Sequence, residues 1–74
     1  MGKADEEARN SSRKRQMFID MLRAGGRITH AVSKTARFYM IVQLGDVKHR
    51  LVKQHWDAIQ PLTMRIGDNW FWRY

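Results

Sequence analysis

The absence of cysteine is the sequence feature that most constrains this chain, because a protein of 74 residues has little core to rely on. A chain of this length buries only about 60 to 65% of the surface that its unfolded state exposes, and packing then supplies roughly a few kcal/mol of stability. Without cysteine, no disulfide adds to that stability and no thiolate can bind a metal. We therefore expect one small domain in a reducing, cytoplasmic compartment, held together by packing or by a partner.

The hydropathy of the chain argues against a membrane segment. The longest apolar run, residues 38–42, is too short to span a bilayer or to form the apolar part of a signal peptide. The chain is therefore predicted to be soluble, with neither a signal peptide nor a transmembrane segment.

The net charge of +7 is concentrated in one part of the chain. Residues 9–37 hold the whole excess, because their basic residues face a single acid, Asp20. Such a block favours a polyanionic partner, and the alternative is a solvated basic face that only aids solubility. The basic residues of the block are Arg9, Arg13, Lys14, Arg15, Arg23, Arg27, Lys34 and Arg37.

The start of the chain is predicted to be a flexible tail. Residues 1–10 are polar, mixed in charge and without apolar periodicity, and a single small basic domain is expected over residues 11–74. Apolar residues then recur at helical spacing until Gly25 and Gly26, so we predict a helix over residues 12–24.

A cluster of three cations would lie in the first turn of this predicted helix. Arg13, Lys14 and Arg15 would then face the positive end of the helix dipole, which disfavours them. Free amides at a helix start, together with three cations, are suited to binding a phosphate. One alternative is that the helix begins further back, at Asp5 to Glu7, where acids would relieve part of this cost. Another is that surface charges are misplaced at little cost.

Two hairpins are predicted from alternating side chains. Residues 37–43 alternate between two apolar and aromatic sets and lead into a turn at 44–46. Residues 28–32 also alternate, so the two segments are expected to pair, with a short helix over 29–35 as the competing interpretation. The second hairpin is expected to join strands at 62–66 and 70–74 through a turn at 67–69.

A second helix is predicted between the two hairpins. Asp46 is expected to cap it, and Pro61 prevents it from continuing past Gln60. The predicted order is therefore α, β, β, α, β, β. This is an α+β fold with two helices packed on antiparallel hairpins, and a winged-helix-like arrangement is one form of it. The apolar stripe of the second helix would consist of Leu51, Val52, His55, Trp56 and Ile59.

The residues needed for catalysis are not found in a recognisable arrangement. The sequence has no phosphate-binding glycine loop and no nucleophile beside a base. His49 and His55 are six residues apart on the predicted helix and point to nearly opposite sides, so they cannot share a metal there. We expect a non-enzymatic protein without cofactor or metal, with His55 as a buried, hydrogen-bonded histidine.

Two stretches resemble known DNA-binding proteins. MFIDMLRAGGRITHAVSKTA, residues 17–36, resembles the opening of helix-turn-helix domains in small phage DNA-binding proteins such as terminase small subunits. HRLVKQHWDAIQ followed by LTMRIGDNWFWRY is similar to the last helix and wing of a winged-helix domain. This resemblance implies that one set of residues faces the groove of DNA and another flanks the wing. The first set is Lys48, His49, Lys53 and Gln54, and the second is Arg65, Asn69 and Arg73.

These observations together predict a small basic nucleic-acid-binding protein that grips the phosphate backbone, with DNA favoured over RNA and a regulatory role. The alternative is a small phage-type inhibitor or regulator that binds a host protein or nucleoprotein complex, for which five methionines and an aromatic end are suited. A homodimer through the C-terminal edge strand is compatible with both. The candidate nucleic-acid-binding residues are Arg13, Lys14, Arg15, Arg23, Arg27, Lys34, Arg37, Lys48, Lys53 and Arg73.

The C-terminal GDNWFWRY is predicted to divide between core and surface. Alternation along a strand places Trp70 and Trp72 with the core, with Tyr74 half-buried. Phe71 and Arg73 would then lie on the other face. Phe71 is the candidate for a partner contact.

Overall fold

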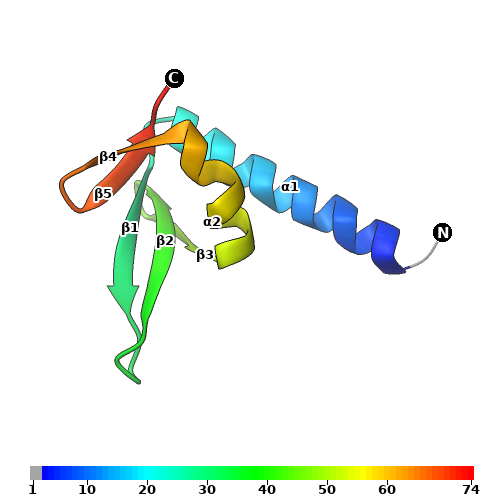
Figure 1. Cartoon of the computed structure of the whole chain (residues 1–74), viewed down its shortest axis with the longest axis horizontal. Helices are drawn as coiled ribbons and strands as arrows, with labels where there is room; N and C mark the ends of the chain where they lie inside the picture. Colours follow the sequence, from blue (N-terminus) through cyan, green and yellow to red (C-terminus); the bar gives the residue numbers. More distant parts are fainter. Residues whose placement is uncertain (1–2) are drawn as a thin grey trace.

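The computed structural model describes residues 3–74 (Figure 1). Two helices and one five-stranded antiparallel sheet form an α+β fold, as the sequence predicts. The elements are α1 (Lys3–Arg23), β1 (Arg27–Val32), β2 (Phe38–Leu44), β3 (Val47–Leu51), α2 (Lys53–Ile59), a 3-10 helix η1 (Gln60–Leu62), β4 (Thr63–Ile66) and β5 (Asn69–Trp72).

The sheet has the strand order β3-β2-β1-β5-β4, and every neighbouring pair is antiparallel. β1 pairs with β2 through all six of its residues, which confirms the first predicted hairpin. It pairs with β5 only through Arg27 and Ile28. The β1–β2 hairpin therefore extends beyond the rest of the sheet, as Figure 1 shows.

The core lies between one face of the sheet and the two helices. Ile28 and Val42 are paired across β1 and β2, and both are fully buried. Phe18 and Leu22 of α1 and Ile59 of α2 belong to the same buried cluster. Burying each of these side chains contributes about 1.5–3 kcal/mol, so this cluster is the main source of stability.

The end of α1 is fixed by two consecutive glycines, as predicted. Gly25 has a φ of +101° and donates its N–H to the carbonyl of Leu22, while Gly26 donates to the carbonyl of Met21 at 2.9 Å. This pair of hydrogen bonds is a Schellman motif, which needs a residue in the left-handed region. A Cβ on Gly26 would lie 2.7 Å from the Met21 carbonyl oxygen and 2.9 Å from that of Gln43, so only glycine lets the chain pass between α1 and β2.

The start of α1 lies at Lys3, so the predicted start at residue 12 is wrong. Asp5 and Glu6 occupy its first turn, where the helix dipole favours acids. The triplet from Arg13 to Arg15 is consequently in the middle of the helix, where the amides are already used by the helix itself. An anion site at free amides beside this triplet is therefore excluded. The flexible tail over residues 1–10 stays a prediction about motion, and residues 1–2 lie outside the described residues.

The predicted second helix is wrong over its first third. Gly45 and Asp46 form a two-residue turn, and the residues after them form β3 rather than a helix that Asp46 caps. Gly45 has a φ of +58°, which suits the first central position of a hairpin turn. The observed order is therefore α, β, β, β, α, β, β, with one more strand than predicted.

The second helix is reduced to the seven residues of α2. His55 and Ile59 are its buried residues, and Trp56 packs against the core, so this part of the predicted apolar stripe is confirmed. Leu51 is also buried, but from the end of β3. Pro61 lies in η1, where α2 has ended, as predicted.

The C-terminal hairpin joins β4 and β5 through a turn at Gly67 and Asp68. Trp70 and Trp72 pack against the core, whereas Tyr74 is 76% exposed and not half-buried as predicted. Tyr74 lies beyond the end of β5, so no neighbouring strand covers it.

The orientation of β4 also differs from the sequence prediction. The alternation of Leu62, Met64 and Ile66 with Thr63 and Arg65 predicts the three apolar residues on the core side. In the structure Thr63 is buried and pairs with Trp72, while Met64 and Ile66 are exposed. The Thr63 hydroxyl donates a hydrogen bond of 2.7 Å to the carbonyl of Gln60, which satisfies the buried oxygen and fixes the face of the strand.

The loop of the β1–β2 hairpin contains one residue in an unfavourable conformation. Ala36 has a φ of +58°, and its N–H donates to the carbonyl of Ser33 at 2.9 Å. The Ser33 hydroxyl accepts a hydrogen bond from the N–H of Arg37, which closes the loop. A residue with a Cβ in the left-handed region costs about 1 kcal/mol relative to glycine.

Replacing Ala36 by glycine should therefore stabilise the protein by about 0.5–1 kcal/mol. The midpoint of urea denaturation should rise, with an unchanged dependence on urea. Ala31→Gly is the matched control, because Ala31 lies within β1 at a negative φ and glycine there should destabilise the sheet. Equal effects of the two substitutions would contradict the assigned strain at Ala36.

Candidate functional site

The sheet has a second face that the core does not use, which we call the open face. Strand pairing places its residues opposite one another, on the reverse side from Ile28 and Val42, and none of them is buried. The open face consists of Arg27, Thr29 and Ala31 from β1, Tyr39, Ile41 and Gln43 from β2, Lys48 and Arg50 from β3, Met64 and Ile66 from β4, and Asn69 and Phe71 from β5.

The charge on the sheet has only one sign. None of the five strands contains an Asp or a Glu. Arg27, Lys48 and Arg50 are exposed on the open face. An anion approaching this face therefore meets cations without local competition from a carboxylate on the strands.

One end of the open face combines a cation with an aromatic ring. The Arg50 guanidinium carbon lies 5.1 Å from the centre of the Tyr39 ring, which is the geometry of a cation–π contact. Beside this pair lies a hollow of about 500 Å³, lined also by Ala31, Ile41 and Lys48. The small side chain of Ala31, the partner of Tyr39 on β1, leaves room for this hollow.

A second aromatic ring lies near the other end of the same face. Phe71 is half-buried, and its neighbours across the sheet are Arg27 on β1 and Met64 on β4. The observed strand register confirms that Phe71 lies on the face opposite Trp70 and Trp72. Its role as a contact residue stays a prediction.

The predicted candidate cations do not form a single patch. Arg27 and Lys48 share the open face, and Arg50, which the sequence analysis did not select, joins them. The signal for Arg50 was present, because Lys48 and Arg50 are two residues apart and follow a Gly-Asp turn. The other candidates lie elsewhere: Arg13, Lys14, Arg15 and Arg23 on α1, Lys34 and Arg37 at or next to the β1–β2 loop, Lys53 on α2 and Arg73 after β5.

The residues that the winged-helix resemblance assigns to a DNA groove do not share a helix. Lys48 and His49 are on β3, whereas Lys53 and Gln54 are in the first turn of α2. Lys48 and His49 are adjacent on a strand, so they point to opposite faces. Of the predicted wing residues, Arg65 is exposed but lies over Trp70 on the core side of β4, with its guanidinium carbon 5.3 Å from the ring centre.

The two edges of the sheet are β3 and β4. β5 lies between β1 and β4, so the C-terminal strand is not the edge that the sequence analysis expected. A homodimer stays a prediction, and a strand pairing between copies would have to use β3 or β4.

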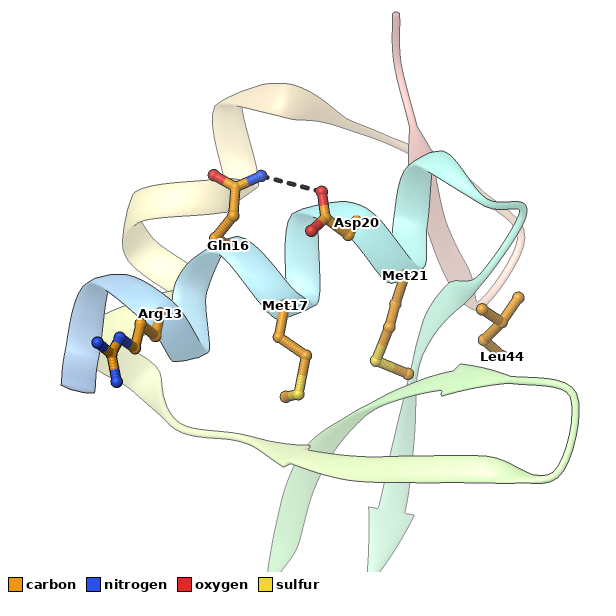
Figure 2. A pocket seen from close by; sticks show the side chains of 6 residues that line it. All are labelled: Arg13, Gln16, Met17, Asp20, Met21 and Leu44. Carbon is orange, nitrogen blue, oxygen red and sulfur yellow. Dashed lines mark hydrogen bonds between the residues drawn. The ribbon is translucent and has the colours of Figure 1, made fainter. Parts of the chain in front are cut away.

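A separate groove runs between α1 and β2 (Figure 2). Met17 and Met21 point from α1 toward Leu44, and Arg13 lies at one end. Asp20 accepts a hydrogen bond of 3.0 Å from the side-chain amide of Gln16 on another side of the helix. The groove has a volume of about 490 Å³ and an apolar floor.

A third feature is the apolar end of the β1–β2 hairpin. Val32 and Phe38 are paired there on the side opposite the open face, and Phe38 is 77% exposed. A hollow of about 480 Å³ beside Phe38 is lined by Val52 and Trp56, and also by the charged residues Arg50, Lys53 and Asp57. The exposed apolar pair therefore lies next to a mixed, partly charged hollow.

Two of the predicted α1 cations act on a buried histidine. His55 is buried between the helices, with its ring 5.7 Å from that of Phe18 in an edge contact. Burial lowers the pKa of His55 from its ordinary value of 6.5, and the charges of Arg15 and Lys14 lower this pKa further. Its Nδ1 atom has no hydrogen-bond partner, so the predicted burial is confirmed without the predicted hydrogen bond at that atom.

The lowered pKa of His55 predicts that stability depends on pH. His55 binds a proton more readily in the unfolded state than in the folded state. The contribution of neutral His55 to the free energy of unfolding is therefore complete above pH 6.5, and it is lost as the pH falls from 6.5 through the lowered pKa of the folded state. Urea midpoints measured between pH 5 and 8 should fall on the acid side, and His55→Gln should reduce this dependence. His49→Gln, at an exposed histidine, is the control and should leave it unchanged. An unaltered pH dependence in His55→Gln would contradict this assignment.

The structure gives no sign of a metal site or a membrane span in the part of the chain that it describes. Among residues 3–74, no three His, Asp or Glu side chains are grouped so that they could hold a metal ion. No helix in the same range is both long enough and apolar enough to cross a membrane. No protein-family model, curated protein or solved structure matches this chain.

Proposed function

We propose that this protein is a non-catalytic nucleic-acid-binding protein that grips the phosphate backbone through the open face of its sheet. The observation that supports this most strongly is the combination on that face of cations, two aromatic rings and no acid on any strand. Phosphate contacts from Lys and Arg supply most of the affinity of such proteins, and aromatic rings add contacts to bases.

The open face is a better candidate surface than the helices. α2 has only seven residues, and its buried side chains, His55 and Ile59, leave it little surface for lying in a groove of DNA. A winged-helix-like mode, with α2 on duplex DNA and the β4–β5 hairpin as its wing, is therefore the weaker form of the proposal. Cations in the C-terminal half of α1 would assist from the side in either form.

The salt dependence of binding tests this proposal. Three cations on the open face, with one or two from nearby elements, would neutralise about four or five phosphates. The logarithm of the affinity should then fall with the logarithm of salt concentration at a slope of roughly −3 to −4.5. Fluorescence anisotropy with labelled DNA and RNA, each as a duplex and as a single strand, measures this slope.

A charge-matched pair of variants separates the open face from net charge. Lys48→Gln with Arg50→Gln removes two cations from the open face, and Arg9→Gln with Arg65→Gln removes two that lie off it, on α1 and on the core side of β4. The first pair should make the slope shallower by roughly 1.4 to 1.8, whereas the second should change it little. Equal losses in both variants would indicate attraction by net charge alone, and no binding at low salt would refute the proposal.

The alternative function is a small regulator or inhibitor that binds a protein. The exposed apolar end of the β1–β2 hairpin favours this alternative, since Phe38 and Val32 are 77% and 58% exposed. Exposed aromatic side chains of this kind are typical anchors of protein interfaces.

A nuclease-treated pull-down distinguishes the alternative from the main proposal. A protein partner should be retained after digestion and lost with Phe38→Ser, while the variant with Lys48→Gln and Arg50→Gln should keep it. If no protein remains after digestion, or if Phe38→Ser retains it fully, the alternative is excluded. Phe38→Ser should leave the free energy of unfolding nearly unchanged, because Phe38 is so exposed.

A further inference from the structure

We propose that the ligand of the open face is single-stranded nucleic acid, with Tyr39 and Phe71 each supporting an unpaired base. This inference rests on the proposed function and specifies the class of nucleic acid. It is carried by the positions of the two rings and their neighbouring cations on the sheet.

The two rings flank the same strand. Tyr39 on β2 is opposite Ala31 of β1, and Phe71 on β5 is opposite Arg27 of β1. Four residues along β1 span about 13 Å, and the two outer strands are about 10 Å apart, so the rings are separated by roughly 16 Å along a diagonal. One base cannot contact both rings, so they would hold two bases of one strand with other nucleotides between them.

The side chains between the two rings are uncharged and do not project far from the sheet. Thr29 and Ile41 are paired there, between the two ring positions, and both are half-buried. Neither side chain is large enough to block a nucleotide chain that crosses from one ring to the other. The hollow beside Tyr39 provides further room at one end of this path.

Each ring has a cation as its direct neighbour. The Arg50 guanidinium lies 5.1 Å from the centre of the Tyr39 ring, and Arg27 is the strand partner of Phe71. Bases stack on aromatic rings and on guanidinium planes alike, and a phosphate next to a stacked base can be bound by the adjacent cation. A ring and a cation are therefore neighbours at two places on the face, over the ring at Tyr39 and across the strand pair at Phe71.

A duplex could use only half of this surface. The bases of a duplex are paired and stacked on one another, so the faces of these bases are not accessible to rings that are half-buried in a sheet. A duplex would contact the cations alone and would gain nothing from Tyr39 or Phe71. The open face should therefore prefer single strands.

Substitution of each ring by leucine tests this inference. Tyr39→Leu and Phe71→Leu keep an apolar side chain but remove the stacking surface. Each should weaken binding of a labelled twelve-nucleotide thymidine strand by roughly five- to a hundredfold, and should leave binding of a duplex of equal length within about twofold. Fluorescence anisotropy at one salt concentration measures both affinities.

The matched control is Phe38→Leu, at an exposed ring on the opposite side of the β1–β2 hairpin. This substitution should change the affinity for neither the single strand nor the duplex. Thermal unfolding of all three variants checks that the fold is retained. If the Tyr39 and Phe71 variants bind the single strand as wild type does, or lose duplex and single strand equally, this inference is overturned while the proposed function stands. If the wild-type protein binds neither probe, both fail.

Discussion

The structure depends on the contact between α1 and the paired residues Ile28 and Val42. Phe18 and Leu22 can cover this pair only because Gly26 lets the end of the helix pass within contact of β2. Since both helices pack on the same face, all of the buried strand residues are on that face. Within residues 3–74, no other element covers the reverse side of the sheet.

The division between the two faces follows from the composition of the strands. The core face holds all of the buried strand residues and both indoles of β5, whereas the open face holds three cations, two rings and a mixture of polar and aliphatic side chains. The cations and rings of the open face add little to the core, so packing does not dictate their identity. A sheet without a single acid is in addition poorly suited to forming ion pairs of its own.

The parts of the fold that sequence alone predicts are those set by local signals. The Gly25-Gly26 pair, the alternation in residues 37–43 and the end of the second helix before Pro61 each act over a few residues. The start of α1 could not be found from apolar periodicity, because its first half has no apolar face. Asp5, placed four residues before Arg9, was a weaker and available sign of helix.

The missed strand β3 shows two local signals in competition. Gly45-Asp46 and Gly67-Asp68 are the same dipeptide and form two-residue turns in both places. The apolar stripe from Leu51 to Ile59 favours a helix, however. Extending this predicted helix back to Asp46 assigned the residues of β3 to it and missed the turn at Gly45-Asp46. The open face itself was beyond sequence reasoning, since it requires the pairing of β1 with β5, which are far apart in the chain.

The position of α1 makes the charge distribution of the molecule asymmetric. Its N-terminal half projects away from the sheet along the longest dimension in Figure 1 and carries Asp5, Glu6 and Glu7. Three of the seven acids are thus gathered at one extremity of a protein with a net charge of +7, which amounts to a permanent electric dipole. In the field of a polyanion, such a dipole experiences a torque that turns the acidic helix end outward. With the ligand proposed above, the acidic end of α1 would therefore trail as the protein approaches.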